Sequence, residues 1–189
     1  QYETEYVRQG LLGIGYQDVA AGESADLCIV NTCTVTREGD SKSRQVIRRL
    51  ARCHPHARIG VMGCYATRAP EEMASLPNVT EVLTDKAELP DFLARRGLLA
   101  PLSGITEFGP RKRAYVKIQD GCKQFCAYCI IPHVRPNLRS RPVEEVVREI
   151  RGLIDRDYRE IVLTGIHLGH YGLDLDTTGE SLDDLLERL

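Results

Sequence analysis

Short apolar runs alternate with longer segments of mixed polarity over the first hundred residues. The run DLCIVN at 26–31 is typical of a buried strand, and the charged segment at 38–52 carries apolar residues at helical spacing. The pattern then recurs as strand, helix, strand and helix, at 58–63, 69–76, 80–84 and 85–97. Gly97 is well placed to end the last of these helices. Alternating strands and helices predict a parallel α/β sheet.

A second region of the same kind follows a segment without periodicity. Residues 99–113, LAPLSGITEFGPRKR, contain several glycines and prolines and end in basic residues, so we expect a linker there. The elements expected after it are a strand, a helix and a strand, at 114–118, 142–154 and 160–165. A further helix is expected where the sequence ends. We therefore predict two α/β domains, at 1–98 and 114–189.

Composition places the chain among folded globular proteins. Its 189 residues are 42% hydrophobic and 28% charged, which is far from the balance of a disordered chain. No run approaches the roughly 18 apolar residues that cross a bilayer, and the start QYETEYVRQG lacks the pattern of a signal peptide. We therefore expect a cytoplasmic protein that does not enter a membrane. The net charge of −2 does not indicate a nucleic-acid binder, although local basic clusters can still bind phosphates.

Seven cysteines form an odd number in a chain too long to be a small disulfide scaffold. Three of them, Cys122, Cys126 and Cys129, have the spacing CxxxCxxC after an expected strand, and soft thiolates at this spacing suit an iron–sulfur cluster. No fourth cysteine lies nearby, so a four-iron cluster would keep one iron open to an external ligand, which implies a reaction. Cys126 and Cys129 alone would fit a redox pair or half a zinc site equally well.

CxxxCxxC with an aromatic residue, Tyr128, before the final cysteine resembles the signature of radical S-adenosylmethionine (SAM) enzymes. The resemblance implies that the three cysteines hold a 4Fe-4S cluster whose open iron binds SAM, so that the cofactor carries the radical chemistry. It also implies that the segment LTG at 163–165 contacts SAM. Tyr128, Thr164 and Gly165 are therefore candidate cofactor contacts. A plain turn after the strand is an equal alternative for 163–165.

Two further cysteines lie at the carboxyl ends of expected strands. Cys33 follows the first strand in NTCTVT and Cys64 follows the second in GCYA, so parallel strands would bring them to the same edge of the sheet. By contrast, Cys28 lies inside a strand and Cys53 at a helix end, where a buried or unremarkable cysteine is the simpler interpretation. Cys33 and Cys64 are therefore the candidates for a second site.

NTCTVT, GCYA, VKIQDGCKQFCAYCIIPHVR, RSRP and TGIHLGHYG, in this order, resemble the methylthiotransferase family. The resemblance implies a Rossmann- or flavodoxin-like α/β domain with a second 4Fe-4S cluster, then a radical SAM (β/α) partial barrel, then a small RNA-binding β domain. It implies that Cys33 and Cys64 ligate the second cluster, with a third cysteine shortly before Gln1. On this interpretation the 189 residues contain the start of the barrel without its remainder, and we expect them to be inactive by themselves.

The resemblance also suggests a substrate. NTCTVTREGDSKSRQ, IQDGC and TGIHLGHYG are most similar to the branch that modifies threonylcarbamoyladenosine in tRNA. That branch implies insertion of sulfur and a methyl group at C2 of adenosine 37, a flavodoxin or ferredoxin as reductant, and a monomer. The alternatives are isopentenyladenosine in tRNA and an aspartate of a ribosomal protein. Alternatives of another class are a non-catalytic metal-binding module and a thiol–disulfide oxidoreductase.

Basic residues give an independent indication of a nucleic-acid substrate. Arg44, Arg48 and Arg52 recur at a spacing of four on one expected helix, and such a face can neutralise phosphates. Basic residues also flank the cysteine loop, namely Arg111, Lys112, Arg113, Arg135, Arg139 and Arg141. A solvated helix face is an equal alternative. The candidate substrate contacts are Arg44, Arg48, Arg135, Arg139 and Arg141. Pro136 stands where the family commonly has glycine, and it stiffens the loop after Arg135.

Overall fold

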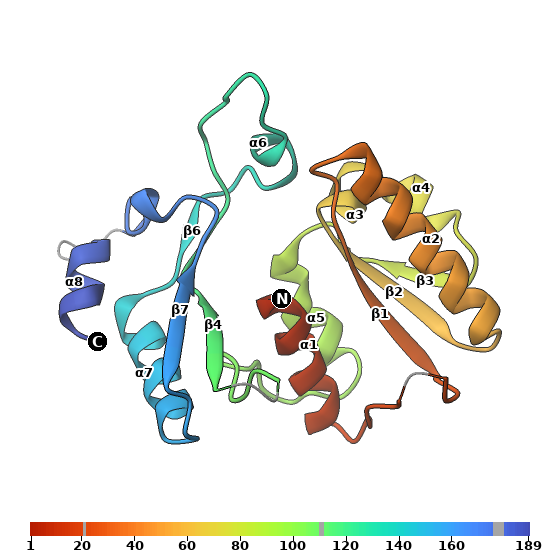
Figure 1. Ribbon diagram of the computed structural model, residues 1–189, viewed down its shortest axis with the longest axis horizontal. Coiled ribbons are helices and arrows are strands. Elements are labelled where there is room, and N and C mark those ends of the chain that lie inside the picture. Colours follow the sequence, from red (N-terminus) through yellow and green to blue (C-terminus); the bar gives the residue numbers. More distant parts are fainter. Residues whose placement is uncertain (21, 110–111, 176–179) are drawn as a thin grey trace. The chain divides into compact units, whose positions relative to one another are not determined.

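The computed structural model describes residues 1–189 except 21, 110–111 and 176–179 (Figure 1). Its contacts divide the chain into two compact units. Unit 1 consists of Gln1–Gln9 and Leu102–Leu189, and unit 2 consists of Gly10–Pro101. Helix α1 (Tyr2–Gly13) therefore contributes residues to both units. The predicted domains, 1–98 and 114–189, place the first nine residues in the N-terminal domain. The contacts place these residues with the second half of the chain instead.

Unit 2 contains a three-stranded parallel sheet in the order β1-β2-β3. Its strands are β1 (Leu27–Thr32), β2 (Arg58–Gly63) and β3 (Val79–Val82). Strands β1 and β2 pair without a break from Leu27 opposite Arg58 to Thr32 opposite Gly63. Both strands therefore end at the same edge of the sheet, and the residues that follow them start from neighbouring positions.

Helices cover both faces of this sheet (Figure 1). They are α2 (Arg37–Cys53), α3 (Cys64–Arg68), α4 (Pro70–Ala74), the 3-10 helix η1 (Lys86–Glu88) and α5 (Leu89–Ala94). Thr36 caps the N-terminus of helix α2, because its side-chain oxygen accepts a hydrogen bond from the backbone N–H of Gly39. On this side, Ile47 of α2 packs with Ile59 and Val61 of β2 in one buried cluster.

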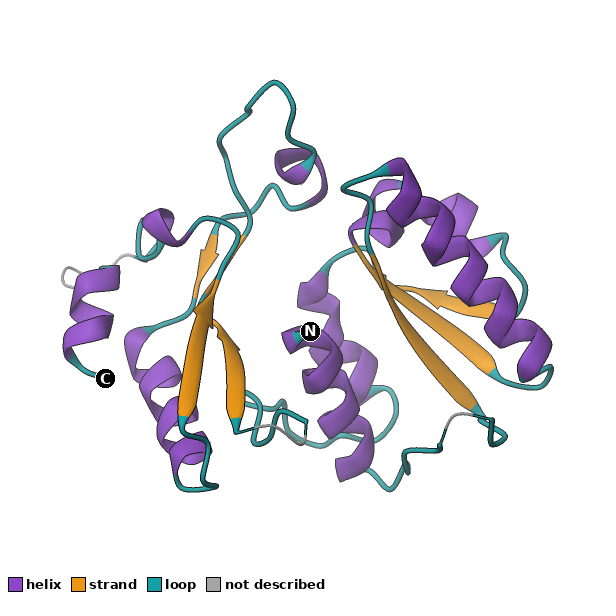
Figure 2. Ribbon diagram, viewed as in Figure 1, coloured by secondary structure: helices purple, strands orange, loops and turns teal. Residues whose placement is uncertain are grey.

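Unit 1 is built on two parallel strands, with a small antiparallel pair beside the cysteine loop (Figure 2). The parallel strands are β4 (Arg113–Lys117) and β7 (Glu160–Thr164), and the antiparallel pair is β5 (Gln119–Asp120) and β6 (Arg139–Ser140). The helices after residue 102 are α6 (Ile131–Val134), α7 (Val143–Ile154), the 3-10 helix η2 (Leu168–His170) and α8 (Leu182–Glu187).

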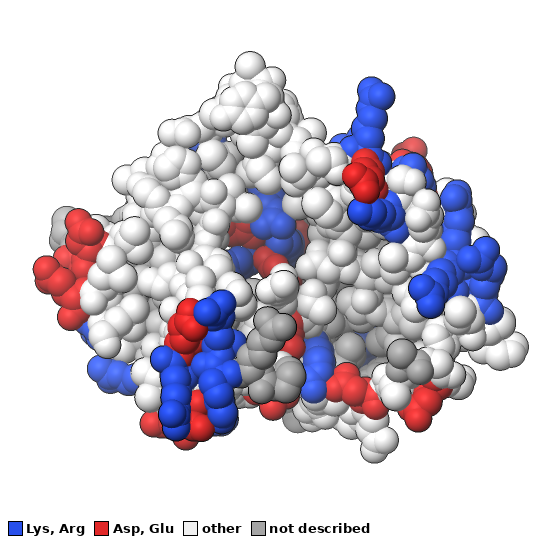
Figure 3. Space-filling view, in the orientation of Figure 1, with Lys and Arg blue, Asp and Glu red and all other residues white. Residues whose placement is uncertain are grey.

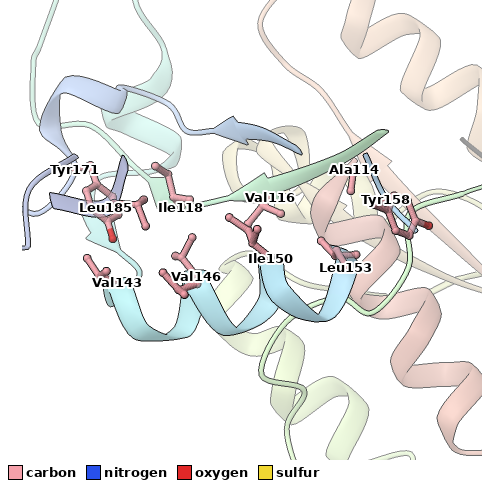
Figure 4. Close-up of a cluster of buried hydrophobic side chains, with 11 residues drawn as sticks. Ala114, Val116, Ile118, Val143, Val146, Ile150, Leu153, Tyr158, Tyr171 and Leu185 are labelled. Carbon is pink, nitrogen blue, oxygen red and sulfur yellow. The ribbon is translucent and has the colours of Figure 1, made fainter. Parts of the chain in front are cut away.

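The core of unit 1 lies between α7 and the sheet (Figure 4). Apolar residues of α7 recur every three or four positions, so Val146, Ile150 and Leu153 share one buried face. They pack against Val116 and other inward side chains of β4. Burial of one such aliphatic side chain stabilises the fold by about 1.5–3 kcal/mol, so this face fixes α7 on the sheet.

The α/β fold class with parallel sheets is confirmed. The expected strand at 58–63 has the observed bounds, and the helix expected at 142–154 is α7. The helix expected at 85–97 is shorter, because α5 ends at Ala94 and Gly97 then turns the chain with a φ of +108°. The short helices α3 and α6, and helix α1, were not predicted. Among the helices of the described residues, none has the length and apolar character needed to cross a bilayer.

Candidate metal centres

The cysteine loop of unit 1 begins at Gly121, directly after β5. Gly121 has a φ of +74°, and a Cβ added there would overlap the carbonyl oxygen of Asn137 and lie 3.1 Å from that of Arg135. Glycine is therefore the residue that fits. The backbone N–H of Cys122 donates to the carbonyl oxygen of Arg135 at 3.2 Å. These contacts bring the two ends of the loop together.

The three cysteines of the loop differ in exposure. Cys122 is buried, Cys129 is half-buried and Cys126 is exposed. The backbone N–H of Gln124 donates to Cys122 Sγ at 3.4 Å, and that of Cys129 donates to the Cys126 carbonyl oxygen at 2.9 Å. Three thiols in one short loop, one of them already accepting an N–H bond, suit an iron–sulfur cluster. No three potential metal ligands converge among the described residues.

Aromatic side chains of this loop face solvent. Tyr128 is 93% exposed, and Phe125 is 72% exposed with its ring edge-on to His133 at 5.7 Å between centroids. The hydroxyl and ring of Tyr128, the expected cofactor contact, are therefore open to an incoming molecule. Gln124 also reaches His170 of η2, with 3.2 Å between the side-chain nitrogens.

A cavity of about 250 Å³ lies at the carboxyl ends of β4 and β7. It is lined by Gln1, Tyr2, Glu3, Tyr115, Lys117, Gln119, Arg135, Thr164, Gly165 and Ile166. Two of the expected SAM contacts, Thr164 and Gly165, are therefore at the cavity, whereas Leu163 packs against the core. A side chain at Gly165 would meet Gln119 Oε1 at 2.9 Å, so the missing side chain keeps this wall open.

Charges of alternating sign run along the cavity. Lys117 Nζ lies 2.9 Å from Glu3 Oε1 and 3.0 Å from Asp120 Oδ2. Asp120 Oδ1 accepts a hydrogen bond from Arg135 Nη1 at 2.8 Å. Arg135, an expected substrate contact, is thus held inside unit 1 by a partly buried carboxylate. Its place at the cavity makes it more suited to a small group than to a phosphate backbone.

Arg141 is occupied within the fold. It forms an ion pair with Glu149, whose side chain is 2% exposed, and donates to the Tyr2 hydroxyl at 3.1 Å. Burial acts to lower the pKa of Arg141, but Glu149 and Tyr2 outweigh it and the pKa lies above its ordinary value. For the neighbouring Tyr2 hydroxyl, burial has the opposite effect and raises the pKa. Since this guanidinium is committed to buried partners, we remove Arg141 from the phosphate contacts.

The second candidate site lies at the edge of the sheet in unit 2. Cys33 follows β1 and is exposed, whereas Cys64 begins α3 and is buried. Gly63, which directly precedes Cys64, has a φ of +98°, and a Cβ there would overlap the carbonyl oxygen of Thr32. The hydroxyl of Thr32 donates to the Met62 carbonyl at 2.7 Å. The ends of β1 and β2 are thus in direct contact, which places both cysteine-bearing segments at one edge.

One buried hydroxyl lies next to Cys33, and the two remaining cysteines of unit 2 differ in exposure. Thr34 Oγ1, next to Cys33, is buried and has no hydrogen-bond partner in the described part of the chain. Cys28 is half-buried in β1, and burial raises the pKa of its thiol. Cys53 is exposed at the end of α2. The orphaned hydroxyl fits a group that would be bound beside Cys33.

Basic side chains gather over α2 (Figure 3). Arg44 donates to the Tyr65 hydroxyl and lies 3.2 Å from Glu72, so it is partly committed to the fold. Arg48 and Arg52 are exposed and pair with no acidic group of the described residues. Arg139 is exposed on β6, and Arg111 lies outside the described residues.

Both units resemble known families. Residues 1–85 match the family described as Uncharacterized protein family UPF0004, and residues 116–187 match the Radical SAM superfamily. Threonylcarbamoyladenosine tRNA methylthiotransferase MtaB of Bacillus subtilis (strain 168) is 42% identical over 191 residues, which cover 92% of this chain and 42% of that protein. The chain belongs to the methylthiotransferase family of radical SAM proteins.

Further relatives show the breadth of this methylthiotransferase family. The Chlamydia pneumoniae protein of the same name as the Bacillus relative is 41% identical, over 90% of this chain and 41% of that protein. Ribosomal protein uS12 methylthiotransferase RimO, also of Chlamydia pneumoniae, is 29% identical, over 95% of this chain and 42% of its own. The chain thus spans about two-fifths of the length of these relatives. Radical SAM membership implies SAM and an iron–sulfur cluster.

The structure adds residues to these candidate sites that the sequence did not single out. Gly63 and Gly121 shape the two cysteine segments, and a glycine before each cysteine was the visible signal. Glu3 and Lys117 meet at the cavity although 114 positions separate them in the sequence. Glu149 carries no local signal, because its buried position appears only when α7 packs on the sheet.

Proposed function

We propose that the protein containing this chain is a tRNA methylthiotransferase that acts at C2 of N6-threonylcarbamoyladenosine 37 and yields the 2-methylthio derivative. The supporting observation is the similarity across both units to relatives named for threonylcarbamoyladenosine tRNA, at 42% and 41% identity. Within Chlamydia pneumoniae the relative named for a ribosomal protein is only 29% identical. The comparison within one organism favours the tRNA substrate.

The residues of the chain supply the binding sites in this proposal. Cys122, Cys126 and Cys129 hold one 4Fe-4S cluster, and Cys33 and Cys64 contribute to a second. When bound, the clusters and SAM supply radical chemistry at C2 together with the sulfur and the methyl group. Thr164 and Gly165 line the cavity at the carboxyl ends of β4 and β7, and the exposed Tyr128 can stack on a bound molecule. A flavodoxin or ferredoxin is the proposed reductant, and the protein acts as a monomer.

Phosphate contacts come from the exposed arginines. Arg48 and Arg52 project from α2 without acidic partners among the described residues, so neutralising a phosphate costs them no existing ion pair. Arg139 is exposed and Arg44 is half-buried, and both stay in the proposed set. Arg135 acts at the cavity instead, through its contact with Asp120.

Nucleoside analysis tests the substrate. Mass spectrometry of tRNA from cells that lack the gene is expected to show loss of the 2-methylthio form of threonylcarbamoyladenosine, and the complete gene product is expected to restore it. Loss of the 2-methylthio form of isopentenyladenosine would identify the other tRNA branch. Unchanged tRNA with an unmodified ribosomal protein would refute the tRNA proposal in favour of the ribosomal one.

Anaerobic reconstitution tests the reaction class. The complete gene product, loaded with iron and sulfide and reduced, is expected to cleave SAM to 5′-deoxyadenosine and methionine. A non-catalytic metal-binding module would bind iron without any change of its spectrum when SAM is added. A thiol–disulfide oxidoreductase would be active without metal through Cys126 and Cys129.

A further inference from the structure

Most of the residues that line the cavity at the carboxyl ends of β4 and β7 carry a polar group, although hydrocarbon parts of their side chains form the larger share of its wall. Among the lining residues that the structure describes, Ile166 has the one purely hydrocarbon side chain. The others offer hydroxyl, amide, carboxylate, ammonium, guanidinium or backbone groups. In small-molecule sites a few such polar groups fix the orientation of the ligand and its specificity. This cavity therefore offers hydrogen-bonding groups to a polar substituent.

Lys117 stands at the centre of these polar groups. Its ammonium carries three N–H donors, and two of them are directed to Glu3 and Asp120 at 2.9 and 3.0 Å. No third hydrogen bond of Nζ is found among the described residues, where the ring of Tyr2 lies 5.9 Å away, and 21% of the side chain is exposed at the cavity. An ammonium donor that is partly withdrawn from water is stabilised by a further acceptor.

The neighbours of Lys117 hold its ammonium in place. Glu3 comes from α1, whereas Asp120 comes from β5 and is itself fixed by Arg135 at 2.8 Å. Two carboxylates on separate elements therefore restrict where Nζ can lie. A donor fixed before binding loses little conformational freedom when it meets a ligand, which strengthens its selectivity.

We propose that Lys117 is a specificity-determining residue that donates its third hydrogen bond to the N6 substituent of the modified adenosine. This inference rests on the proposed function. A threonylcarbamoyl group offers a carboxylate, a hydroxyl and a carbonyl as acceptors, whereas an isopentenyl group offers none. A site built to donate a hydrogen bond rejects an analogue without an acceptor far more strongly than an apolar pocket rejects a polar one. Lys117 thus selects threonylcarbamoyladenosine over isopentenyladenosine.

Equilibrium binding to anticodon stem–loop RNA tests the inference without turnover. The complete gene product, reconstituted with iron and sulfide, is titrated with labelled RNAs that carry threonylcarbamoyladenosine, isopentenyladenosine or plain adenosine at position 37. The wild type is expected to prefer the first. Lys117→Met is expected to weaken binding of that RNA by about 10- to 100-fold, the cost of a lost charged hydrogen bond, and to leave the other two within about twofold.

Matched variants separate this role from folding. Lys112→Met removes an exposed ammonium of the same unit, which pairs with Asp157 at 2.8 Å, and is expected to leave the preference among the three RNAs unchanged. Glu3→Gln combined with Lys117→Met removes the paired charges together, so that Glu3 is not left buried without its partner. The double variant is expected to show the same loss of preference as Lys117→Met.

The outcomes distinguish the inference from the proposed function. If the wild type prefers threonylcarbamoyladenosine RNA and both Lys117 variants keep that preference, the specificity role is overturned and the proposed function stands. If the wild type has no preference for that RNA, the proposed substrate is wrong. If Lys117→Met weakens SAM binding in equilibrium dialysis while RNA preference is unchanged, Lys117 serves the cofactor and the inference is overturned.

Discussion

A glycine directly precedes a cysteine in both units, at Gly63-Cys64 and at Gly121-Cys122, and the two glycines lie against different parts of the fold. Both glycines have a positive φ, and at both a Cβ would overlap a carbonyl oxygen of another segment. The oxygen opposite Gly63 belongs to Thr32, which is buried in β1. The oxygen opposite Gly121 belongs to an exposed loop residue. Gly63 therefore allows close packing at the edge of a sheet, and Gly121 allows the two ends of a loop to approach each other.

The candidate cluster cysteines of the two units also differ in what would bring them to one cluster. Those of unit 1 lie within eight residues of one loop, so their proximity depends mostly on local chain geometry. Cys33 and Cys64 of unit 2 come from segments after two different strands, so any approach between them depends on the register of β1 and β2. Metal binding at the candidate site of unit 2 should therefore depend more on the stability of its sheet. Metal binding in unit 1 should depend more on the conformation of its own loop.

Removing the cysteines gives the largest expected effect. Cys122→Ala/Cys126→Ala/Cys129→Ala is expected to abolish iron binding in unit 1, because a cluster needs thiolate ligands, and to keep the iron held through Cys33 and Cys64. Iron analysis and electron paramagnetic resonance of the complete gene product measure both sites.

Cys33→Ala/Cys64→Ala is the reciprocal control and is expected to spare the loop site. If either variant empties both sites, the two centres are not independent and the comparison fails.

The next largest effect is expected at Gly63. Gly63→Ala forces a methyl group against the backbone of β1 and strains a positive φ, so we expect the free energy of unfolding of unit 2 to fall by about 3 kcal/mol or more. Urea denaturation measures it. Gly97→Ala is the matched control, because Gly97 has a φ of +108° with open space around it, and should cost about 1 kcal/mol. Equal losses of unfolding free energy in the two variants would show that the contact between Gly63 and β1 contributes nothing beyond backbone strain.

Gly121→Ala is expected to have a smaller and more local effect. The exposed segment at Asn137 can move away from a new methyl group, so the unfolding free energy should fall by about 1–3 kcal/mol, mostly from backbone strain. Iron bound by the loop should fall in parallel, while the unit 2 site is unchanged. A loss as large as that of Gly63→Ala would mean that this loop is as rigid as the sheet edge.

The smallest effect is expected on the surface of α2. Arg48→Gln should reduce the slope of log affinity for tRNA against log salt by about 1, because one phosphate contact is lost. Arg44→Gln should reduce it less, since Arg44 already contacts Tyr65 and Glu72. Filter binding over a salt series measures both slopes. Identical slopes for wild type and Arg48→Gln would exclude α2 from the RNA-binding surface.

Local periodicity was enough to predict much of the framework. The apolar positions of α7 recur every three or four residues, and the runs at β1 and β2 are short and apolar, so these elements follow from the sequence. The short helix α3 was missed because it has five residues and immediately follows a strand. Helix α1 was missed because its apolar residues do not form a clear stripe and glycines interrupt it.

The sequence by itself determined that three closely spaced thiols form a candidate cluster site, because eight residues of chain cannot carry them far apart. It also determined the order of most of the longer strands and helices, since periodicity is a property of neighbouring residues. Only the tertiary structure decided that Arg141 is paired with the buried Glu149 and that Lys117 meets Glu3. These pairs depend on which faces pack together, and packing joins residues that no local pattern connects.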